Sequence, residues 1–310
     1  MDRTAGRTGA GGPAPITVEP SREARVGAAT VRRALPRRRR RTIGAWCFAD
    51  HIGPDTVDDG SGSSGPGGIG PHPHIGLQTV TWLLAGELLH RDSLGSEQSV
   101  RPGQLNLMTA GHGIAHAEES RTPSGATVHG IQLWVAQPEA TRDGGSDFEH
   151  HDELPRTELD HGEATVLVGE LLGARSSARA DTDHHGAELR LRPGTSTVPL
   201  RTDHEHALIV LEGEASVGGH DGRRLVPGEV ALVDPGRDEL ALAATGPTTL
   251  MLLGGSPFPD PVHMWWNFVG RDRAAIDRAW SDWTAGADRF GPTGSPMERI
   301  EVGAPPWQHG

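Results

Sequence analysis

Short apolar segments separated by turn residues dominate the chain from Thr42 onward. The segments TVTWLLAGELLHRD, SEQSVRPGQLNLMTAG and ATVHGIQLWVAQP are rich in β-branched residues and alternate between apolar and polar positions. This alternation is typical of strands with one buried face. Gly86 and Glu87 predict a hairpin turn within the first segment. No convincing amphipathic helix interrupts the run, so the pattern predicts an all-β fold.

An internal repeat divides the chain. LLAGEL (83–88) followed by RPGQLNLM (101–108) recurs as VLEGEA (210–215) followed by VPGEVALV (226–233). Gly86 precedes Pro102 by 16 residues, and Gly213 precedes Pro227 by 14. Two copies of one strand-turn-strand unit predict two similar β domains in tandem.

The remaining segments set the expected domain boundaries. The first 40 residues show no periodicity and predict a disordered arm. Asp59–Pro71 has the composition of a flexible loop, and a charged, His-rich stretch separates the two copies. We therefore expect the following order: a disordered basic arm at 1–40, an N-terminal metal-binding domain at 41–140, a linker at 141–163, a C-terminal domain with a helix at 164–286, and a tail at 287–310.

One helix is expected near the C-terminus, in DRAAIDRAWSDWTAG. Asp272 is its candidate N-cap, and Ile276, Trp280 and Trp283 recur on one face. We expect Trp307 to tie the following tail to the folded body.

Charge and cysteine content narrow the class of partner. The formal net charge of −12 argues against nucleic acid and anionic membranes as partners. Arg32, Arg33 and Arg37–Arg41 make the arm basic, as in a nucleic-acid arm or an address label, but a solvated tail is the favoured interpretation. Cys47 is the single cysteine, so no intrachain disulfide forms, and it is interpreted as a small buried hydrophobe. With no signal-peptide pattern and no long apolar run, we expect a cytoplasmic protein without a membrane span.

Two histidine-containing pairs carry the candidate chemistry. His72 and His74 flank Pro73, and His116 and Glu118 flank Ala117. Side chains at i and i+2 of a strand share a face, so two such pairs on neighbouring strands aim four groups at one point. Three imidazoles and a carboxylate without a thiolate suit ferrous iron, while zinc, manganese, nickel, copper or cobalt remain open.

The second copy serves as an internal control. Counting the same offsets from its glycines gives Pro199, Arg201, Ala241 and Ala243, so this copy has no equivalent metal ligands. His204 and His206 also form an i, i+2 pair but have no downstream partner, and we interpret them as a surface pair.

Three further histidines have structural interpretations. His112 lies in a glycine-flanked turn, and His90 is expected to hydrogen-bond within the hairpin. His129 precedes a strand and is interpreted as a core histidine with its hydrogen bonds satisfied.

The motifs resemble those of the pirin family, a bicupin group of the cupin superfamily. FADHIGP, PHPHIGLQTVTWLLAGELLHRDSLGS, RPGQLNLMTAGHGIAHAEES and GIQLWV resemble successive blocks of its N-terminal domain, and PLRTDHEHALIVLEGE and LLGGSPFPDPV resemble its C-terminal domain. The resemblance implies two jelly-roll β-barrels packed face to face. It also implies a metal in the first barrel only, held by His72, His74, His116 and Glu118. It covers about Thr42 to Gly286.

This sequence departs from the family pattern near the expected pocket. Ile75, Leu77 and Gln78 stand where the family commonly has Arg, Phe and Glu, and the glycine-rich insertion before His72 is long. We expect both departures to alter the pocket mouth.

Three functions follow as hypotheses. The resemblance to quercetinases implies a dioxygenase whose partners are a small flavonol-like aromatic substrate and dioxygen. In that hypothesis Glu118 is either the base that removes the substrate hydroxyl proton or a charge-balancing ligand. The alternative is a non-enzymatic, metal-dependent redox-sensing regulator that acts through a protein partner. A third is a cupin that only binds or stores a small ligand.

Overall fold

The computed structural model describes residues 15–27, 29–57, 68–219 and 222–309. Residues 1–14 and 28 of the predicted arm, and residues 59–67 of the predicted glycine-rich loop, lie outside this range.

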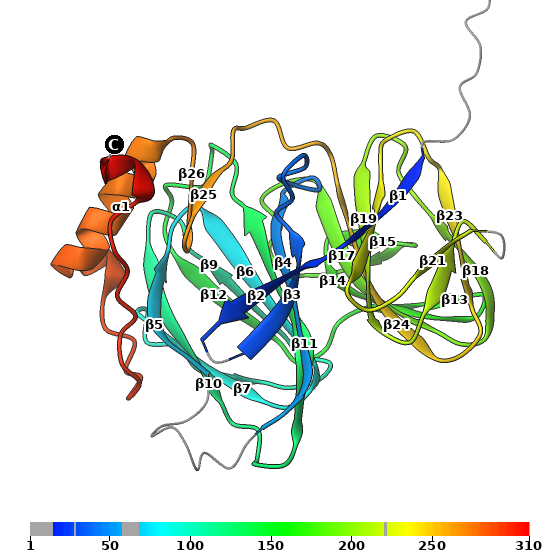
Figure 1. The fold of residues 1–310 in the computed structure, drawn as a ribbon, viewed down its shortest axis with the longest axis horizontal. Helices are drawn as coiled ribbons and strands as arrows, with labels where there is room; N and C mark the ends of the chain where they lie inside the picture. The colour runs from blue at the N-terminus through cyan, green and yellow to red at the C-terminus, as the bar shows by residue number, and fades with distance from the viewer. Residues whose placement is uncertain (1–14, 28, 58–67, 220–221, 310) are drawn as a thin grey trace, which may run out of the picture.

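The first barrel is built from a large and a small antiparallel sheet (Figure 1). In spatial order, its seven-stranded sheet contains β12 (Asp147–His151), β9 (Leu105–Thr109), β6 (Leu77–Ala85), β11 (Thr127–Ala136), β4 (Trp46–Thr56), β3 (Ala29–Leu35) and β2 (Arg22–Val26). Its four-stranded sheet contains β5 (Gly68–His74), β10 (Ile114–Ser120), β7 (Leu88–Asp92) and β8 (Glu97–Val100).

The second barrel repeats this plan. Its seven-stranded sheet contains β1 (Ile16–Pro20), β22 (Glu229–Val233), β19 (Glu205–Glu212), β24 (Thr248–Gly255), β17 (His184–Leu191), β14 (Gly162–Val168) and β13 (Arg156–Leu159). Its four-stranded sheet contains β18 (Gly194–Pro199), β23 (Glu239–Ala244), β20 (Ala215–Val217) and β21 (Arg223–Leu225). The remaining elements are the strand pairs β15 (Glu170–Leu171) with β16 (Ala174–Arg175) and β25 (His263–Trp265) with β26 (Phe268–Gly270), the helix α1 (Arg273–Ala285), and the short 3-10 turns η1 (Asp288–Phe290) and η2 (Pro306–His309).

The repeat seen in the sequence is confirmed, but its turn is not a hairpin. β6 and β7 flank Gly86 and Glu87, yet they belong to different sheets of the first barrel. Gly213 occupies the same place between β19 and β20. Gly86 and Gly213 have φ values of 93° and 74°, a backbone region that favours glycine. The glycine shared by the two copies therefore turns the chain from the large sheet to the small one.

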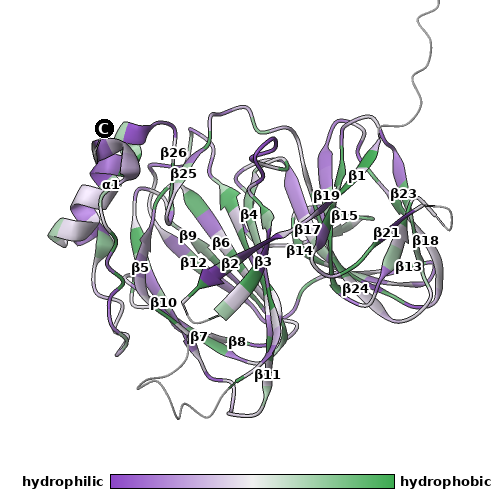
Figure 2. Ribbon diagram, viewed as in Figure 1, coloured by the Kyte–Doolittle hydropathy of each residue, from purple (hydrophilic) through white to green (hydrophobic). Residues whose placement is uncertain are grey.

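The two large sheets pack face to face across one shared apolar layer. Alternate residues of β6, β9 and β11 point into it from the first barrel, and alternate residues of β19, β22 and β24 point into it from the second. Fully buried members include Trp82, Leu133, Ile209 and Leu253. Figure 2 shows the corresponding alternation of apolar and polar residues along the strands. This confirms the expected face-to-face pair of barrels.

The two ends of the chain cross between the barrels. β1 adds an edge strand to the second barrel, with Ile16 opposite Val233, whereas α1 packs on the first barrel (Figure 1). The apolar face of α1 contacts Ile75 and Phe268. The helix expected within the C-terminal domain thus completes the N-terminal one.

The structure corrects the disordered arm where it is described. Its described residues include the strands β1, β2 and β3, because pairing with neighbouring strands satisfies their backbone groups. Arg33 donates two hydrogen bonds to Asp50 at 2.7 and 2.8 Å, and Arg37 donates to Glu19 at 2.5 Å. Carboxylates therefore neutralise Arg33 and Arg37, which are not part of a solvated run, whereas Arg38, Arg39 and Arg41 are exposed as expected.

The segment expected as a linker, 141–163, also carries structure. β12 within it pairs with β9 of the first barrel, and β13 pairs with β14 of the second. The linker therefore supplies one edge strand to each barrel.

The predicted helix and its cap are confirmed. Asp272 Oδ1 accepts a hydrogen bond from the backbone N–H of Ala275 at 2.8 Å, and Gly286 ends the helix with φ 70°. The Trp307 indole donates to Asp277 on the helix at 2.9 Å and holds the tail there. No helix among the described residues is long and apolar enough to span a membrane.

A buried polar chain joins the barrels. The His51 and His129 Nε2 atoms lie 2.9 Å apart, and His129 Nδ1 lies 3.2 Å from a carboxylate oxygen of Glu212 on the second barrel. Arg32 approaches His51 Nδ1 at 3.4 Å. His129 is 2% exposed, which confirms it as a core histidine with its hydrogen bonds satisfied.

This row of buried histidines and their partners predicts that the folded protein loses stability in acid. Burial, reinforced by His129 and Arg32, lowers the pKa of His51 from 6.5 to about 3. Below pH 6.5 the unfolded chain binds a proton that the folded chain excludes, so folding weakens by up to about 1.4 kcal/mol per pH unit as pH falls toward 3. Urea unfolding between pH 7 and 5 measures this slope, and His51→Gln should flatten it. Exposed His112→Gln is the matched control; equal slopes for His51→Gln and wild type would contradict the prediction.

Candidate metal centre

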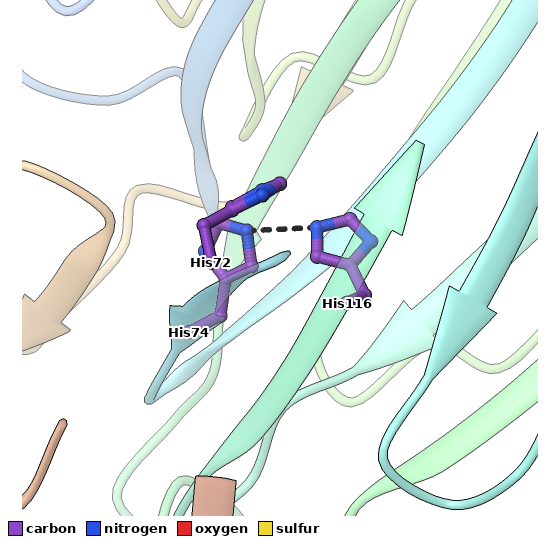
Figure 3. Close-up of side chains that lie close together, drawn as sticks. All are labelled: His72, His74 and His116. Atoms are coloured by element: carbon purple, nitrogen blue, oxygen red, sulfur yellow. Dashed lines mark hydrogen bonds between the residues drawn. The ribbon is translucent and has the colours of Figure 1, made fainter. Parts of the chain in front are cut away.

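The small sheet of the first barrel brings the predicted ligands together. β5 and β10 are antiparallel neighbours with His116 opposite His72. His72, His74 and His116 are buried, and their ring centres lie 4.3 to 5.0 Å apart (Figure 3). One ligand nitrogen from each lies within 4.8 Å of the others. Among the described residues, this is the one cluster with that geometry.

Backbone carbonyls fix the tautomers of the two histidines on β5. His72 Nδ1 donates to the Gly70 carbonyl at 2.8 Å, and His74 Nδ1 donates to the Asn267 carbonyl at 2.9 Å. A carbonyl only accepts, so each Nδ1 carries the hydrogen of a neutral ring. Each Nε2 therefore keeps its lone pair for a metal.

A carboxylate-histidine pair orients His116. Asp92 accepts from His90 Nε2 at 3.0 Å, which leaves His90 Nδ1 as an acceptor. His116 Nδ1 lies 3.3 Å from that atom and donates to it. His116 Nε2 thus also keeps its lone pair.

The remaining contact of the triad indicates a cation. His74 and His116 approach each other through their Nε2 atoms at 3.1 Å, the dashed line in Figure 3. With both hydrogens on Nδ1, two lone pairs face each other and repel unless a positive charge lies between them. The donor set therefore fits a divalent metal bound by three Nε2 atoms.

Burial keeps the three rings neutral. It lowers the pKa of His72 to about 4 and those of His74 and His116 well below 6.5, and the neighbouring imidazoles lower them further. Neutral imidazole is the form that binds a metal. The site is therefore ready for a metal at neutral pH.

Glu118 lies beside the triad, outside the set of atoms that converge. The register of β10 against β5 shifts between His116 and Glu118, which sets the carboxylate back from the three nitrogens. Thr81 Oγ1 donates to it at 3.2 Å. Burial raises the pKa of Glu118, against the smaller lowering effects of His90 and Thr81. A buried carboxyl of raised pKa is suited to holding a proton.

A cavity of about 420 Å³ opens onto these four residues. Phe48 and Trp134 stack with ring centres 4.0 Å apart in its wall, and Trp134 also meets the edge of His74 at 5.1 Å. The arginine-carboxylate pair Arg33 and Asp50 lines the same wall. The cavity can take a flat aromatic molecule with polar substituents.

Sequence reasoning missed several contributors to this site. Asn267 and Ile300 reach the cavity from segments that follow the second barrel, and Ile300 N–H donates to the Pro71 carbonyl at 2.9 Å. His90 and Asp92 show the same i, i+2 spacing as the ligand pairs, which is the signal that could have indicated a polar face on β7.

Ile75, Leu77 and Gln78 do not line this cavity, so the expectation that they alter its mouth is wrong, whereas Ile69 of the glycine-rich segment does line it. Leu77 is buried in an apolar cluster and Ile75 packs beneath α1. The Gln78 side chain donates to Thr109 at 3.0 Å within the sheet.

The strands of the second barrel that correspond to β5 and β10 carry no metal ligand on their inner face. Leu240, Leu242 and Ala244 of β23 point into that barrel together with Val198 of β18, and Leu242 pairs with Ser196. Ala241 and Ala243, expected from the sequence count, therefore lie on the opposite face of β23.

The interpretation of His204 and His206 as a surface pair is wrong: each is 1% exposed. His206 points into the second barrel, because its strand face also carries Leu208 and Val210 of the inner core, and the His204 ring lies beside it with ring centres 6.0 Å apart.

The other structural interpretations hold. His112 lies in its turn, with Nδ1 3.2 Å from the Gly144 carbonyl. Cys47 is fully buried, and burial raises the pKa of its thiol to about 12. His90 forms its hydrogen bonds at the metal site, and thus has a larger role than a hairpin contact.

Comparison with known families accounts for the two barrels. Residues 28–135 match the family model Pirin, and residues 186–291 match the model of the Pirin C-terminal cupin domain. The chain belongs to the pirin family. Its two barrels are therefore the tandem cupin domains that the motifs implied.

Relatives extend this relation over most of the chain. A Pseudomonas aeruginosa protein named "Putative quercetin 2,3-dioxygenase PA1205" is 45% identical over 282 residues, covering 90% of this chain and 86% of that protein. A pirin-like protein of Caulobacter vibrioides is 37% identical, covering 83% and 88%. A solved structure, a crystal structure of quercetin 2,3-dioxygenase from Acinetobacter baumannii, shares 40% sequence identity with this chain at a TM-score of 0.87. The match covers 94% of this chain and 96% of that one.

The hydrogen bonds from His116 to His90 and from His90 to Asp92 predict how a substitution of Asp92 affects metal affinity. Asp92→Asn removes the carboxylate that fixes His90, so His116 loses its fixed orientation, and metal affinity should fall roughly 10- to 100-fold. Competition with a chromophoric chelator measures this. Asp152→Asn, on a carboxylate that binds His150 away from the site, is the control. An Asp92→Asn variant with wild-type affinity would contradict the role of these hydrogen bonds.

Proposed function

We propose that this pirin-family chain is a mononuclear, iron-dependent dioxygenase that opens flavonol-type aromatics such as quercetin. The observation that carries the proposal is the convergence of three neutral imidazoles, through Nε2, at the cavity lined by Phe48 and Trp134. Relatives named as quercetin 2,3-dioxygenases support the substrate class. Zinc, manganese, nickel, copper and cobalt suit the same ligands, so the choice of ferrous iron belongs to the proposal.

His72, His74 and His116 would hold the metal, with Glu118 as a fourth and more labile ligand. When bound, the metal would supply Lewis acidity toward substrate oxygens and redox chemistry toward dioxygen. The carbonyls of Gly70 and Asn267 keep two of the ligands oriented.

The cavity walls would position the substrate. Phe48 and Trp134 present an aromatic surface against which a flat flavonol packs. Arg33, held by Asp50, lies over the Phe48 ring at 4.5 Å and places a cation beside that surface. Phenolic oxygens of the substrate would face this cation.

Glu118 would remove the substrate hydroxyl proton. Its burial raises the pKa of the carboxyl, which strengthens the carboxylate as a base. Thr81 holds one carboxylate oxygen, so the other is free to accept the proton.

The single buried Cys47 supports a cytoplasmic setting for this chemistry.

Oxygen uptake on quercetin tests the proposal. We expect ferrous-loaded wild type to consume oxygen and His116→Ala to lose both metal and activity. Glu118→Gln should keep the metal but lower kcat by about 10²–10⁴-fold, because a positioned base contributes that much. His112→Ala, four residues from His116 and exposed, is the matched control and should behave as wild type.

Two results would overturn the proposal in different ways. Metal binding without oxygen consumption would refute the dioxygenase while retaining the site, and would favour the redox-sensing regulator with a protein partner. Failure of ferrous iron to bind at all would refute both.

A further inference from the structure

A second group of histidines lies inside the second barrel. His185 on β17, His206 on β19 and His204 just before β19 are 6%, 1% and 1% exposed. Their ring centres are 5.5, 5.7 and 6.0 Å apart. We call these three residues the second histidine cluster.

The ring nitrogens of this cluster lack hydrogen-bond partners. His185 Nε2 and both ring nitrogens of His204 and of His206 are buried without one. Asp183 lies beside the cluster: its carboxylate is 3.5 Å from His204 Nε2 and is itself held by Arg201. Leaving buried polar atoms unpaired costs about 1–3 kcal/mol each, so this cluster requires an explanation beyond packing.

Strand register shows that the second histidine cluster occupies the position in the second barrel that corresponds to the metal-site cavity in the first. Thr79 and Phe48 both pair with Trp134 on the central strand β11. In the second barrel, His206 and His185 both pair with Gly254 on β24. Thr79 and His206 each stand seven residues before the glycine of their repeat. The second barrel therefore has imidazoles where the first has the wall of its metal-site cavity.

Gly254 makes room for these rings. A Cβ at this position would lie 2.5 Å from His185 Nε2 and 2.7 Å from His206 Cδ2. Where the first barrel has the indole of Trp134, the second has no side chain, and the two imidazoles occupy that space.

We infer that His185, His204 and His206 form a second divalent-metal site, separate from the one proposed for catalysis. Metal–nitrogen bonds of about 2.0–2.1 Å put the ring centres of three ligating imidazoles roughly 4.5–5.5 Å apart, so the observed spacing of 5.5 to 6.0 Å requires only a small inward movement of the rings. The ring nitrogens do not yet converge as closely as in the first barrel, so binding requires the rings to turn about their Cβ–Cγ bonds.

The chemistry of the cluster selects the class of metal. Burial and mutual repulsion lower the pKa of His185 to about 3 and that of His206 to about 4, so both are neutral ligands at physiological pH. Three imidazoles without a thiolate favour zinc, nickel, copper or cobalt over calcium and magnesium, which prefer oxygen.

Cobalt stoichiometry tests the inference on the tag-free, demetallated full-length chain. Co²⁺ is added, unbound ion is removed by gel filtration, and bound cobalt is counted by mass spectrometry alongside its visible spectrum. We expect two ions per chain in wild type, one in His116→Ala and one in His206→Asn. Exposed His161→Asn in the same barrel is the control and should retain two.

Gly254→Ala gives an independent test, because it keeps every imidazole but fills the space between them; it should also bind one ion. A wild type that binds one ion, or a His116→Ala variant that binds none, would overturn the second site. Retention of two ions by both His206→Asn and Gly254→Ala would overturn it as well. None of these readouts depends on quercetin turnover, so the result stands apart from the proposed dioxygenase.

Discussion

The rest of the structure depends on the apolar layer shared by the two large sheets. Neither sheet could expose this face to water, since burying apolar surface is the main force that stabilises a fold. The layer is continuous from Trp82 and Leu133 on one side to Ile209 and Leu253 on the other. It fixes each barrel against its partner and leaves the small sheets on the outside. The candidate metal centre lies on one of these small sheets.

The crossing of the chain ends connects this layer to the site. The N-terminal strand β1 precedes the first barrel but pairs with the second. The segment after the second barrel returns to cover the first. The returning segment supplies the Asn267 carbonyl that sets the His74 tautomer and the Ile300 side chain in the cavity wall. His74 and Asn267 are 193 positions apart. The site of the first barrel therefore requires the whole chain to be folded.

Local spacing correctly predicted that three imidazoles would lie together, because strand side chains alternate with period two, which needs no knowledge of the rest of the fold. It could not show that Asp92 and His90 support His116, since that depends on which strand lies beside β10. The structured arm was missed for the same reason: β1 is stable only through its pairing with β22, more than two hundred residues away. Loop lengths differ between the repeats, so counting from glycines selected Ala241 and Ala243, which lie on the face of β23 opposite the inner core. It also gave no indication that His204 and His206 are buried.

The central claim is that the Nε2 atoms of His72, His74 and His116 converge because a metal binds them there. Anomalous diffraction from crystals of the ferrous-loaded protein, measured on both sides of the iron absorption edge, tests it most directly. The account predicts an iron peak about 2.0–2.2 Å from all three Nε2 atoms, the ordinary length of such bonds, with Nδ1 still bonded to Gly70, Asn267 and His90. A peak that contacts Nδ1 atoms, or no iron peak at this cavity, would contradict it.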